Sequence, residues 1–232
     1  MITGMPIDKL ASKILEDAKS KRDLLIPTPE IRVTAEKVNP GKSNEARVVN
    51  AEILDRDGTF DMTKLALHQL TEYLGIPEKY MDVMWDRDPD LISTNMNRLM
   101  MKHHQERRMF RTLDAGSGRT NPLVRSVLSD RYHRLDNEAV AENILPIVQK
   151  QGLVVRSAQA TDTRLYIHVT SPRVVGEVRV GDPVTFGWLI TNSEVGLGAL
   201  ALQVIIERLA CKNGMIVPEY SKRKAHLGGR AE

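Results

Sequence analysis

Cysteine is almost absent from the sequence, with Cys211 the single example among 232 residues. One cysteine excludes an internal disulfide and is typical of proteins in a reducing compartment. The sequence also has no apolar run of bilayer-spanning length, and residues 1–23 carry acids and lack the apolar core of a secretory signal. We therefore expect a soluble cytoplasmic protein with no membrane partner.

Recognised catalytic motifs are missing as well. There is no GxSxG, HExxH, CxxC or Walker lysine pattern, and the histidines lack the spacing of a zinc site. Asp86, Asp88 and Asp90 resemble part of a calcium loop, but Leu91 and Asn97 stand where an EF-hand requires glycine and glutamate. We therefore predict that the protein is not an enzyme and needs no cofactor or metal. The aspartates are better explained by an N-cap before a helix.

Two glycine-containing segments keep alternatives open. Residues 196–201 match the GxGxxA pattern of dinucleotide-binding proteins, which makes a nucleotide-dependent enzyme a third hypothesis. Four polar residues, 191–194, separate the preceding predicted strand from the first glycine, where the pattern requires an immediate turn. Residues 116–119 form either a phosphate-binding loop or a flexible connector.

Charge is unevenly distributed, although the net charge is only +3. Residues 30–97 contain 13 acidic and 8 basic residues, whereas residues 98–134 contain 9 basic and 3 acidic residues. A basic segment of this kind attracts polyanions, unless its charges lie on different faces and only keep the domain in solution. Aromatic residues are scarce, at 4% of the sequence, which limits the number of stacking platforms for bases.

Periodicity and turn residues predict an α+β protein whose second half is rich in strands. The predicted helices cover residues 7–20, 62–74 with Asp61 as the N-cap, 91–111 and 137–152. The predicted strands cover residues 46–54, 123–135, 153–158, 164–170, 173–180 and 184–190, and we favour a further strand within 196–214. No segment is long enough for an interdomain linker. The expected organisation is a helical segment over residues 1–25 and a single domain over residues 26–232.

In the predicted helix 91–111, apolar side chains form one stripe and cations spread over the opposite face. Arg98, Lys102 and Arg108 are the clearest candidates on that face for contact with a ligand. Tyr132 either stacks on a base or packs as a half-buried strand tyrosine. The expected nucleic-acid-binding residues are Arg98, Lys102, Arg107, Arg108, Arg111, Arg119, Arg125, Arg131, Tyr132, Arg134, Lys222, Arg223 and Lys224.

Several segments between about residues 50 and 230 resemble the phage/plasmid-like domain of unknown function family. The first group is Phe110-Arg111-Thr112, Val124 to Tyr132 and Leu135-Asp136-Asn137; the second is Thr191 to Ala199, Arg208-Leu209, Cys211, Asn213 to Ile216 and His226 to Arg230. The sequence departs from the family pattern at Lys212, where a small polar residue is expected, and at Val204, where relatives carry proline. Family members are longer, so the resemblance implies that a C-terminal portion is missing here.

The resemblance implies a mobile-element protein with a remote likeness to the Rad/Red-type single-strand annealing proteins. Those proteins pack a curved antiparallel sheet with helices, assemble as rings, and hold single-stranded DNA along a basic groove without catalysis. We therefore expect a homo-oligomeric DNA-binding and strand-annealing recombination protein, with a host single-strand-binding protein as a further partner. The alternative is a protein-interaction module that binds a host factor through the acidic region from Glu30 to Asp90.

Overall fold

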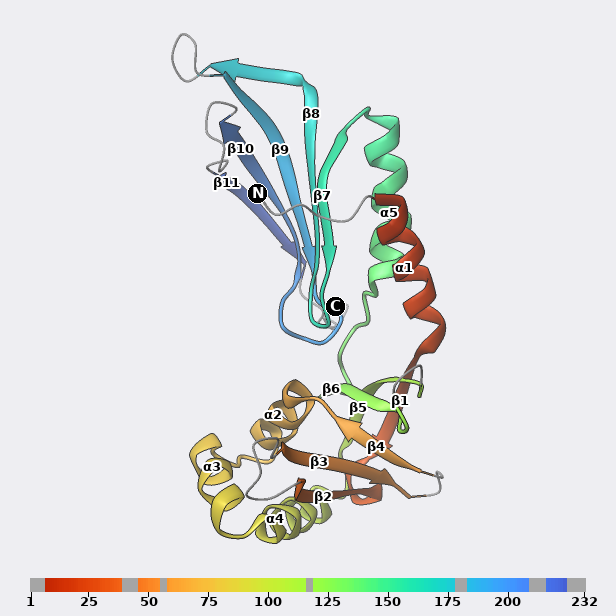
Figure 1. The fold of residues 1–232 in the computed structure, drawn as a ribbon, viewed down its shortest axis with the longest axis vertical. Coiled ribbons are helices and arrows are strands. Elements are labelled where there is room, and N and C mark those ends of the chain that lie inside the picture. Colours follow the sequence, from red (N-terminus) through yellow and green to blue (C-terminus); the bar gives the residue numbers. More distant parts are fainter. Residues whose placement is uncertain are drawn as a thin grey trace. The chain divides into compact units, whose positions relative to one another are not determined.

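The computed structural model describes residues 7–38, 46–54, 58–115, 119–177, 183–208 and 216–224. Contacts within the chain divide it into two compact units (Figure 1). Unit 1 contains Met1–Lys19 and His133–Glu232, and unit 2 contains Ser20–Tyr132. Division by contacts does not test whether each unit folds independently, so the single domain over residues 26–232 stays a prediction.

Unit 2 is a six-stranded sheet packed against three helices (Figure 1). Its elements are β1 (Lys21–Pro27), the 3₁₀ turn η1 (Thr28–Glu30), β2 (Ile31–Val38), β3 (Ala46–Ile53), β4 (Thr59–Met62), α2 (Lys64–Tyr73), α3 (Glu78–Arg87), α4 (Pro89–Lys102), β5 (Arg107–Leu113) and β6 (Leu123–Ser129). The strand order is β1-β5-β6-β4-β3-β2, in which only the pairing of β4 with β6 is parallel.

The apolar stripe predicted for α4 forms the centre of the core of unit 2. Ile92, Met96 and Met100 follow one another at four-residue spacing, so they lie on one face of the helix, and all three are completely buried. They pack with Phe110 of β5 and Trp85 of α3. This burial supplies most of the driving force that holds α4 on the sheet.

The predicted helix 91–111 is wrong over its second half. The helix ends at Lys102, and the chain turns through His103 before it enters β5. Thr28 fixes this turn, because its hydroxyl donates to the His103 carbonyl at 2.6 Å and its backbone N–H donates to the Glu106 carbonyl at 3.0 Å. Strand β5 then pairs with β1 on one side and β6 on the other. These long-range pairings outweigh the helical preference of the local sequence.

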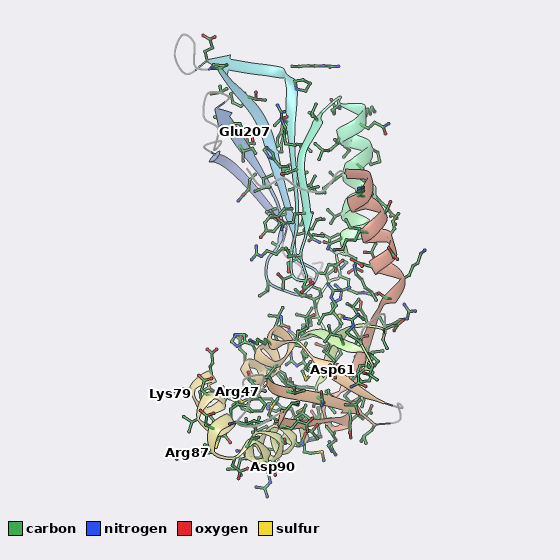
Figure 2. The ribbon with its side chains drawn as sticks, viewed as in Figure 1. Arg47, Asp61, Lys79, Arg87, Asp90 and Glu207 are labelled. Carbon is green, nitrogen blue, oxygen red and sulfur yellow. The ribbon has the colours of Figure 1, made fainter. Side chains whose placement is uncertain are left out.

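The start of α2 also differs from prediction. Asp61, labelled in Figure 2, belongs to β4. Its carboxylate accepts a hydrogen bond from Asn121 at 2.9 Å. Thr63 is the N-cap, and its hydroxyl accepts from the Ala66 backbone N–H at 3.0 Å. The capping aspartate predicted before α4 is confirmed, since Asp88 accepts from the Asp90 backbone N–H at 3.2 Å.

Unit 1 is a five-stranded antiparallel sheet with two helices. Its elements are α1 (Ile7–Ser20), α5 (Asn137–Lys150), β7 (Val154–Ala160), β8 (Leu165–Glu177), β9 (Pro183–Asn192), β10 (Leu200–Arg208) and β11 (Ile216–Lys224). The strand order is β11-β10-β9-β8-β7. Ile14 of α1 and Val140 of α5 share a core with Ile167 of β8 and Ile190 of β9.

Most predictions for unit 1 are confirmed, including the helix over residues 7–20 and the strand within residues 196–214. The two strands predicted at 164–170 and 173–180 form one strand, β8, whose register shifts between Thr170 and Val175. The α+β class is confirmed. Among the described residues each sheet keeps two edge strands, so neither closes into a barrel.

Candidate nucleic-acid interface

The basic stretch from Arg98 to Arg134 does not form one continuous element. Arg98 and Lys102 lie on α4, three arginines lie on β5, and the others lie on β6 or in the segments that flank it. Arg134 belongs to unit 1, as do Lys222, Arg223 and Lys224 of the edge strand β11. The predicted site residues are therefore divided between the two units.

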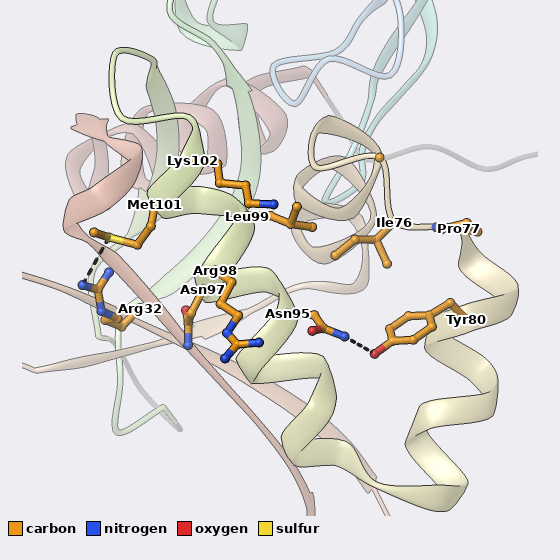
Figure 3. A pocket seen from close by; sticks show the side chains of 11 residues that line it. Arg32, Ile76, Pro77, Tyr80, Asn95, Asn97, Arg98, Leu99, Met101 and Lys102 are labelled. Atoms are coloured by element: carbon orange, nitrogen blue, oxygen red, sulfur yellow. Dashed lines mark hydrogen bonds between the residues drawn. The ribbon is translucent and has the colours of Figure 1, made fainter.

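A groove of about 890 Å³ lies at the C-terminal half of α4, within unit 2 (Figure 3). We call it the α4 groove. Its lining residues come from β2, the α2–α3 connection, α3 and α4; they are Arg32, Gly75, Ile76, Pro77, Tyr80, Asn95, Asn97, Arg98, Leu99, Met101 and Lys102. Three of these residues are cationic and none is acidic. Such a lining gives the groove a positive potential that favours anionic ligands.

Polar side chains of α4 hold the helix against β2, which is an edge strand of the sheet. The Asn97 carboxamide accepts from the Val33 N–H at 2.9 Å and donates to the Val33 carbonyl at 3.0 Å. Ser93 accepts from the Ala35 N–H at 2.8 Å. These bonds satisfy backbone groups that an edge strand otherwise leaves unpaired. They also fix the register of α4, and so the positions of Arg98 and Lys102.

Arg98 and Lys102 are exposed and lie four residues apart on α4. Like charges at this spacing destabilise a helix by about 0.2–0.5 kcal/mol. Within the part of the chain that the structure describes, neither side chain has a hydrogen-bond or ion-pair partner. Lys102 lies in the last helical turn, where the helix dipole stabilises a cation. Arg98 lies a turn earlier, where the dipole contributes less.

Other residues of the lining, on both sides of Arg98 in Figure 3, are held by hydrogen bonds of their own. One terminal nitrogen of Arg32 donates to the carbonyls of Pro29 and Ile31 at 2.8 and 2.9 Å. Asn95 donates to the Tyr80 hydroxyl at 2.6 Å (Figure 3). These contacts fix a guanidinium group and an aromatic ring in the lining before any ligand binds.

Arg108, by contrast, is held by the protein. Its guanidinium stacks over the Tyr73 ring at 3.4 Å from the centroid and donates to Glu106 at 3.1 Å. The His103 ring also forms a hydrogen bond with the Glu106 carboxylate at 3.1 Å. Of the contacts that lower the pKa of the Glu106 carboxyl, this hydrogen bond has the largest effect. Burial, above all, raises the pKa of Tyr73. Cation–π stacking and ion pairing of this kind stabilise the turn between α4 and β5.

Arg111 is buried and ion-paired. Its side chain is 2% exposed, and two of its nitrogens donate to the Asp23 carboxylate of β1 at 2.9 and 3.3 Å. A bidentate pair of this type holds neighbouring strands together. We therefore assign Arg111 to the fold and leave it outside the α4 groove.

The remaining cations of unit 2 occupy separate positions. Arg107 begins β5, Arg119 precedes β6 and Arg131 follows it, and all three are exposed. Arg125 is half-buried within β6. Tyr132 is half-buried as well. Both interpretations of Tyr132, as a stacking ring or as a packed tyrosine, stay open.

The GxGxxA segment lies in the connection between β9 and β10, which pair antiparallel. Gly196 has a φ of 81° in this turn, and the chain then enters β10 at Leu200. A dinucleotide site requires a strand, a tight turn and then a helix whose N-terminus faces the pyrophosphate. No helix follows this turn in the described residues. Residues 116–118 and Cys211, singled out in the sequence, lie outside them.

The polar residues just before that turn form a buried network. The Glu194 carboxylate accepts from the Asn137 N–H at 2.8 Å, so it satisfies the N-terminus of α5 in place of Asp136, whose side chain makes no capping bond. Asn192 donates to the Leu135 carbonyl and to the Asn137 side chain, both at 2.9 Å. These residues hold the helix start against the sheet.

Two further findings bear on function. Among the described residues, no group of three or more histidine, cysteine, aspartate or glutamate side chains is placed to hold a metal ion. None of the described helices combines the length and the apolar character needed to span a membrane.

Sequence reasoning missed most residues of the α4 groove, among them Arg32, Tyr80 and Asn95. Arg32 lies in the acidic third of the sequence, and Tyr80 and Asn95 lie on two different helices. Only the packing of α3 and α4 against each other and of α4 against β2 brings them together. No local pattern could have indicated this arrangement.

Comparison with known protein families gives a match over part of the chain. No curated protein and no solved structure matches the chain. The match covers β6 and most of unit 1, so it includes the buried Glu194 network and leaves the α4 groove outside it. The resemblance seen in the sequence is supported in part, since residues 124–226 match the family described as Domain of unknown function (DUF932).

Proposed function

We propose that this protein binds single-stranded DNA without catalysis and promotes the annealing of complementary strands. The α4 groove carries this proposal, because Arg32, Arg98 and Lys102 line it with no acidic residue among them. Cations along a path bind the phosphate backbone whatever the sequence, with an affinity that falls as salt rises. Binding through phosphates leaves base edges available for pairing.

The finer parts of the proposal extend beyond the groove. We propose a homo-oligomer, in the form of a ring, with a remote likeness to Rad/Red-type annealing proteins, a phage or plasmid origin and a cytoplasmic location. The α+β plan with two antiparallel-rich sheets supports the likeness. Arg134 and Lys222 to Lys224 would form a second basic segment in unit 1, and a host single-strand-binding protein would be a further partner. Negative-stain microscopy with and without single-stranded DNA tests the ring, which predicts closed particles of uniform diameter.

Charge-removing substitutions test DNA binding at the α4 groove. We expect Arg98→Gln with Lys102→Gln to weaken binding of a single-stranded oligonucleotide about tenfold or more, because two charge-assisted contacts are lost. The slope of log affinity against log salt should decrease by about 1.4, at about 0.7 for each phosphate contact with a single strand. Fluorescence anisotropy over a salt series measures both quantities.

A matched control comes from the neighbouring helix. Lys79 and Arg87 of α3 are exposed cations outside the groove (Figure 2). Their replacement by glutamine removes the same net charge and should change affinity by less than about threefold, as expected from long-range electrostatics in salt. Equal losses in the two double variants would refute the assignment to the groove.

Annealing is tested separately with complementary labelled oligonucleotides. The protein should accelerate duplex formation, measured by energy transfer between the two labels, and the Arg98→Gln, Lys102→Gln variant should not. If the protein binds single strands but does not accelerate duplex formation, its proposed function is single-strand binding without annealing.

The alternative function, a protein-interaction module, depends on the acidic region. Part of that region is already neutralised, since the Asp86 carboxylate lies 3.3 Å from Lys37 and 3.0 Å from Arg47. The hydrogen bond from Lys37, followed by the charge of Arg47, lowers the pKa of Asp86. For this reason we favour DNA. Under the alternative, the Arg98→Gln, Lys102→Gln variant would keep full activity.

A further inference from the structure

The α4 groove contains side chains that phosphate binding does not require. Alongside its cations it has a wall made of Ile76 and Pro77 from the α2–α3 connection and Tyr80 from α3. Figure 3 shows the Tyr80 ring directed toward Asn95 of α4. Phosphate recognition requires cations and N–H donors, whereas an apolar and aromatic wall suits a planar ring.

We infer that the α4 groove holds one unpaired nucleotide of the DNA strand, with its base against Tyr80 and its flanking phosphates on Arg98, Lys102 and Arg32. This inference rests on the proposed function and adds to it a contact with the base. Arg98 and Lys102 lie one helical turn apart, about 6 Å along the axis. They therefore offer two cationic positions along the path of a backbone.

The hydrogen bonds of the groove prepare it for such a ligand. Asn95 donates one N–H to the Tyr80 hydroxyl at 2.6 Å, which fixes the ring and leaves the amide oxygen and a second N–H for a base edge. Asn97, in contrast, uses both ends of its carboxamide on Val33 and serves only to position the helix. The volume of about 890 Å³ is within the range of pockets that hold small organic ligands.

Stacking explains why this base contact would not demand a particular sequence. Every base has a π-face, so an aromatic platform accepts all four. Because the α4 groove holds one base, it leaves the neighbouring bases exposed for pairing. The inference is therefore compatible with annealing, and it predicts one sequestered base for each bound copy of the protein.

The test compares two strands of equal length, an oligothymidine and a strand in which every base is replaced by an abasic sugar. We expect the protein to bind the oligothymidine more tightly. Tyr80→Leu, which keeps apolar bulk and removes the aromatic face, should weaken binding to oligothymidine about tenfold and leave binding to the abasic strand unchanged. Tyr80→Phe, which keeps the ring, should stay within about twofold of the parent for both strands.

Several outcomes overturn the inference. Equal affinity for the two strands, with no effect of Tyr80→Leu, refutes the base contact. The proposal that the groove binds DNA would still hold if the Arg98→Gln, Lys102→Gln variant lost binding. If that double variant also binds normally, both proposals fail. Binding of free thymidine monophosphate more tightly than oligothymidine would show that the ligand is a free nucleotide. Should Tyr80→Leu not fold, Asn95→Ala replaces it and should narrow the difference between the two strands.

Discussion

One polar cluster from each unit of this protein shows two different uses of polar residues. In unit 1, Asn137, Asn192 and Glu194 are buried and hydrogen-bonded to one another or to the backbone. In unit 2, Arg98 and Lys102 are exposed in a groove without acidic residues. The residues that match a known family therefore hold a fold together, whereas the best candidate for ligand binding lies outside the match. A family signature marks what the fold requires, which need not be the site of action.

The tryptophans make this comparison measurable. The sequence contains two, and they are divided between the units: Trp85 is in α3 of unit 2, and Trp188 is in β9 of unit 1. Trp188→Phe leaves a fluorescence reporter for unit 2 alone, and Trp85→Phe leaves one for unit 1 alone. Each prediction below can be followed in the unit where its effect is expected.

The largest effect should come from the buried arginine. Arg111→Met removes the buried guanidinium that is ion-paired with Asp23, so we expect unit 2 to lose about 3–5 kcal/mol of unfolding free energy. Denaturant unfolding of the Trp188→Phe protein measures this loss. Arg98→Met is the control, because an exposed arginine without a protein partner should change stability by less than about 0.5 kcal/mol. Similar losses for Arg98 and Arg111 would remove the distinction between groove and fold.

The next largest effect should fall on unit 1. Glu194→Ala leaves the buried Asn137 N–H without an acceptor, at a cost of about 2 kcal/mol. Unfolding of the Trp85→Phe protein measures it, with Glu142→Ala on the exposed face of α5 as the control. DNA binding by the folded variant should equal that of the parent. A weaker affinity at unchanged stability would place Glu194 in the binding machinery and contradict the division between the units.

A smaller effect is expected at the beginning of α4. Asp88→Ala removes the N-cap and should destabilise unit 2 by about 1 kcal/mol. The groove lies toward the other end of the helix, so the affinity for DNA should change by less than about twofold at temperatures where the variant is folded. Thermal unfolding followed by Trp85 fluorescence checks the first part, and anisotropy checks the second.

The smallest effect should appear on acidification. Burial lowers the pKa of His168 below its usual 6.5; Glu207, whose carboxylate lies 3.5 Å away, opposes this shift, and Arg156 adds to it. The unfolded chain then binds a proton more readily, so the stability of unit 1 should be full above pH 6.5 and decline as the pH falls below it.

Unit 2 should respond at lower pH. The His103 hydrogen bond lowers the pKa of Glu106 below 4.5, so the stability that this carboxylate contributes is lost only as the pH falls below that value. Between pH 7 and pH 5, the Trp188 reporter should detect weakening that His168→Gln abolishes, while the Trp85 reporter stays constant. A parallel decline of both reporters would contradict this assignment.

Much of the fold could be predicted from local patterns. The helix over residues 7–20, the cap at Asp88 and the strand at Leu200–Arg208 follow from periodicity and capping chemistry. The error at the end of α4 has a physical cause, because β5 forms through its pairing with β1, which lies more than 80 positions earlier in the chain. A local pattern carries no information about such a partner.

The candidate site was predictable only in part. Arg98 and Lys102 follow from charge and helical spacing, and both line the groove. Arg108 shares the same pattern but lies beyond the end of the helix, where Tyr73 and Glu106 bind it. Arg32 and Tyr80 carry no local signal, since their role depends on tertiary packing. Sequence therefore indicated the type of surface, but only two of the eleven residues that line the groove.

The discontinuity of unit 1 has a consequence for biosynthesis. Helix α1 precedes unit 2 in the chain, but Val140 and Ile167, which pack with its Ile14, are translated only after all of unit 2. At typical elongation rates this delay is on the order of ten seconds, and an isolated 14-residue helix is barely stable in water. Unit 2 therefore has time to pair its strands before unit 1 can assemble, provided that Tyr132 has left the ribosomal exit tunnel. Limited proteolysis of a nascent chain stalled far enough beyond Tyr132 tests whether unit 2 is then already protected.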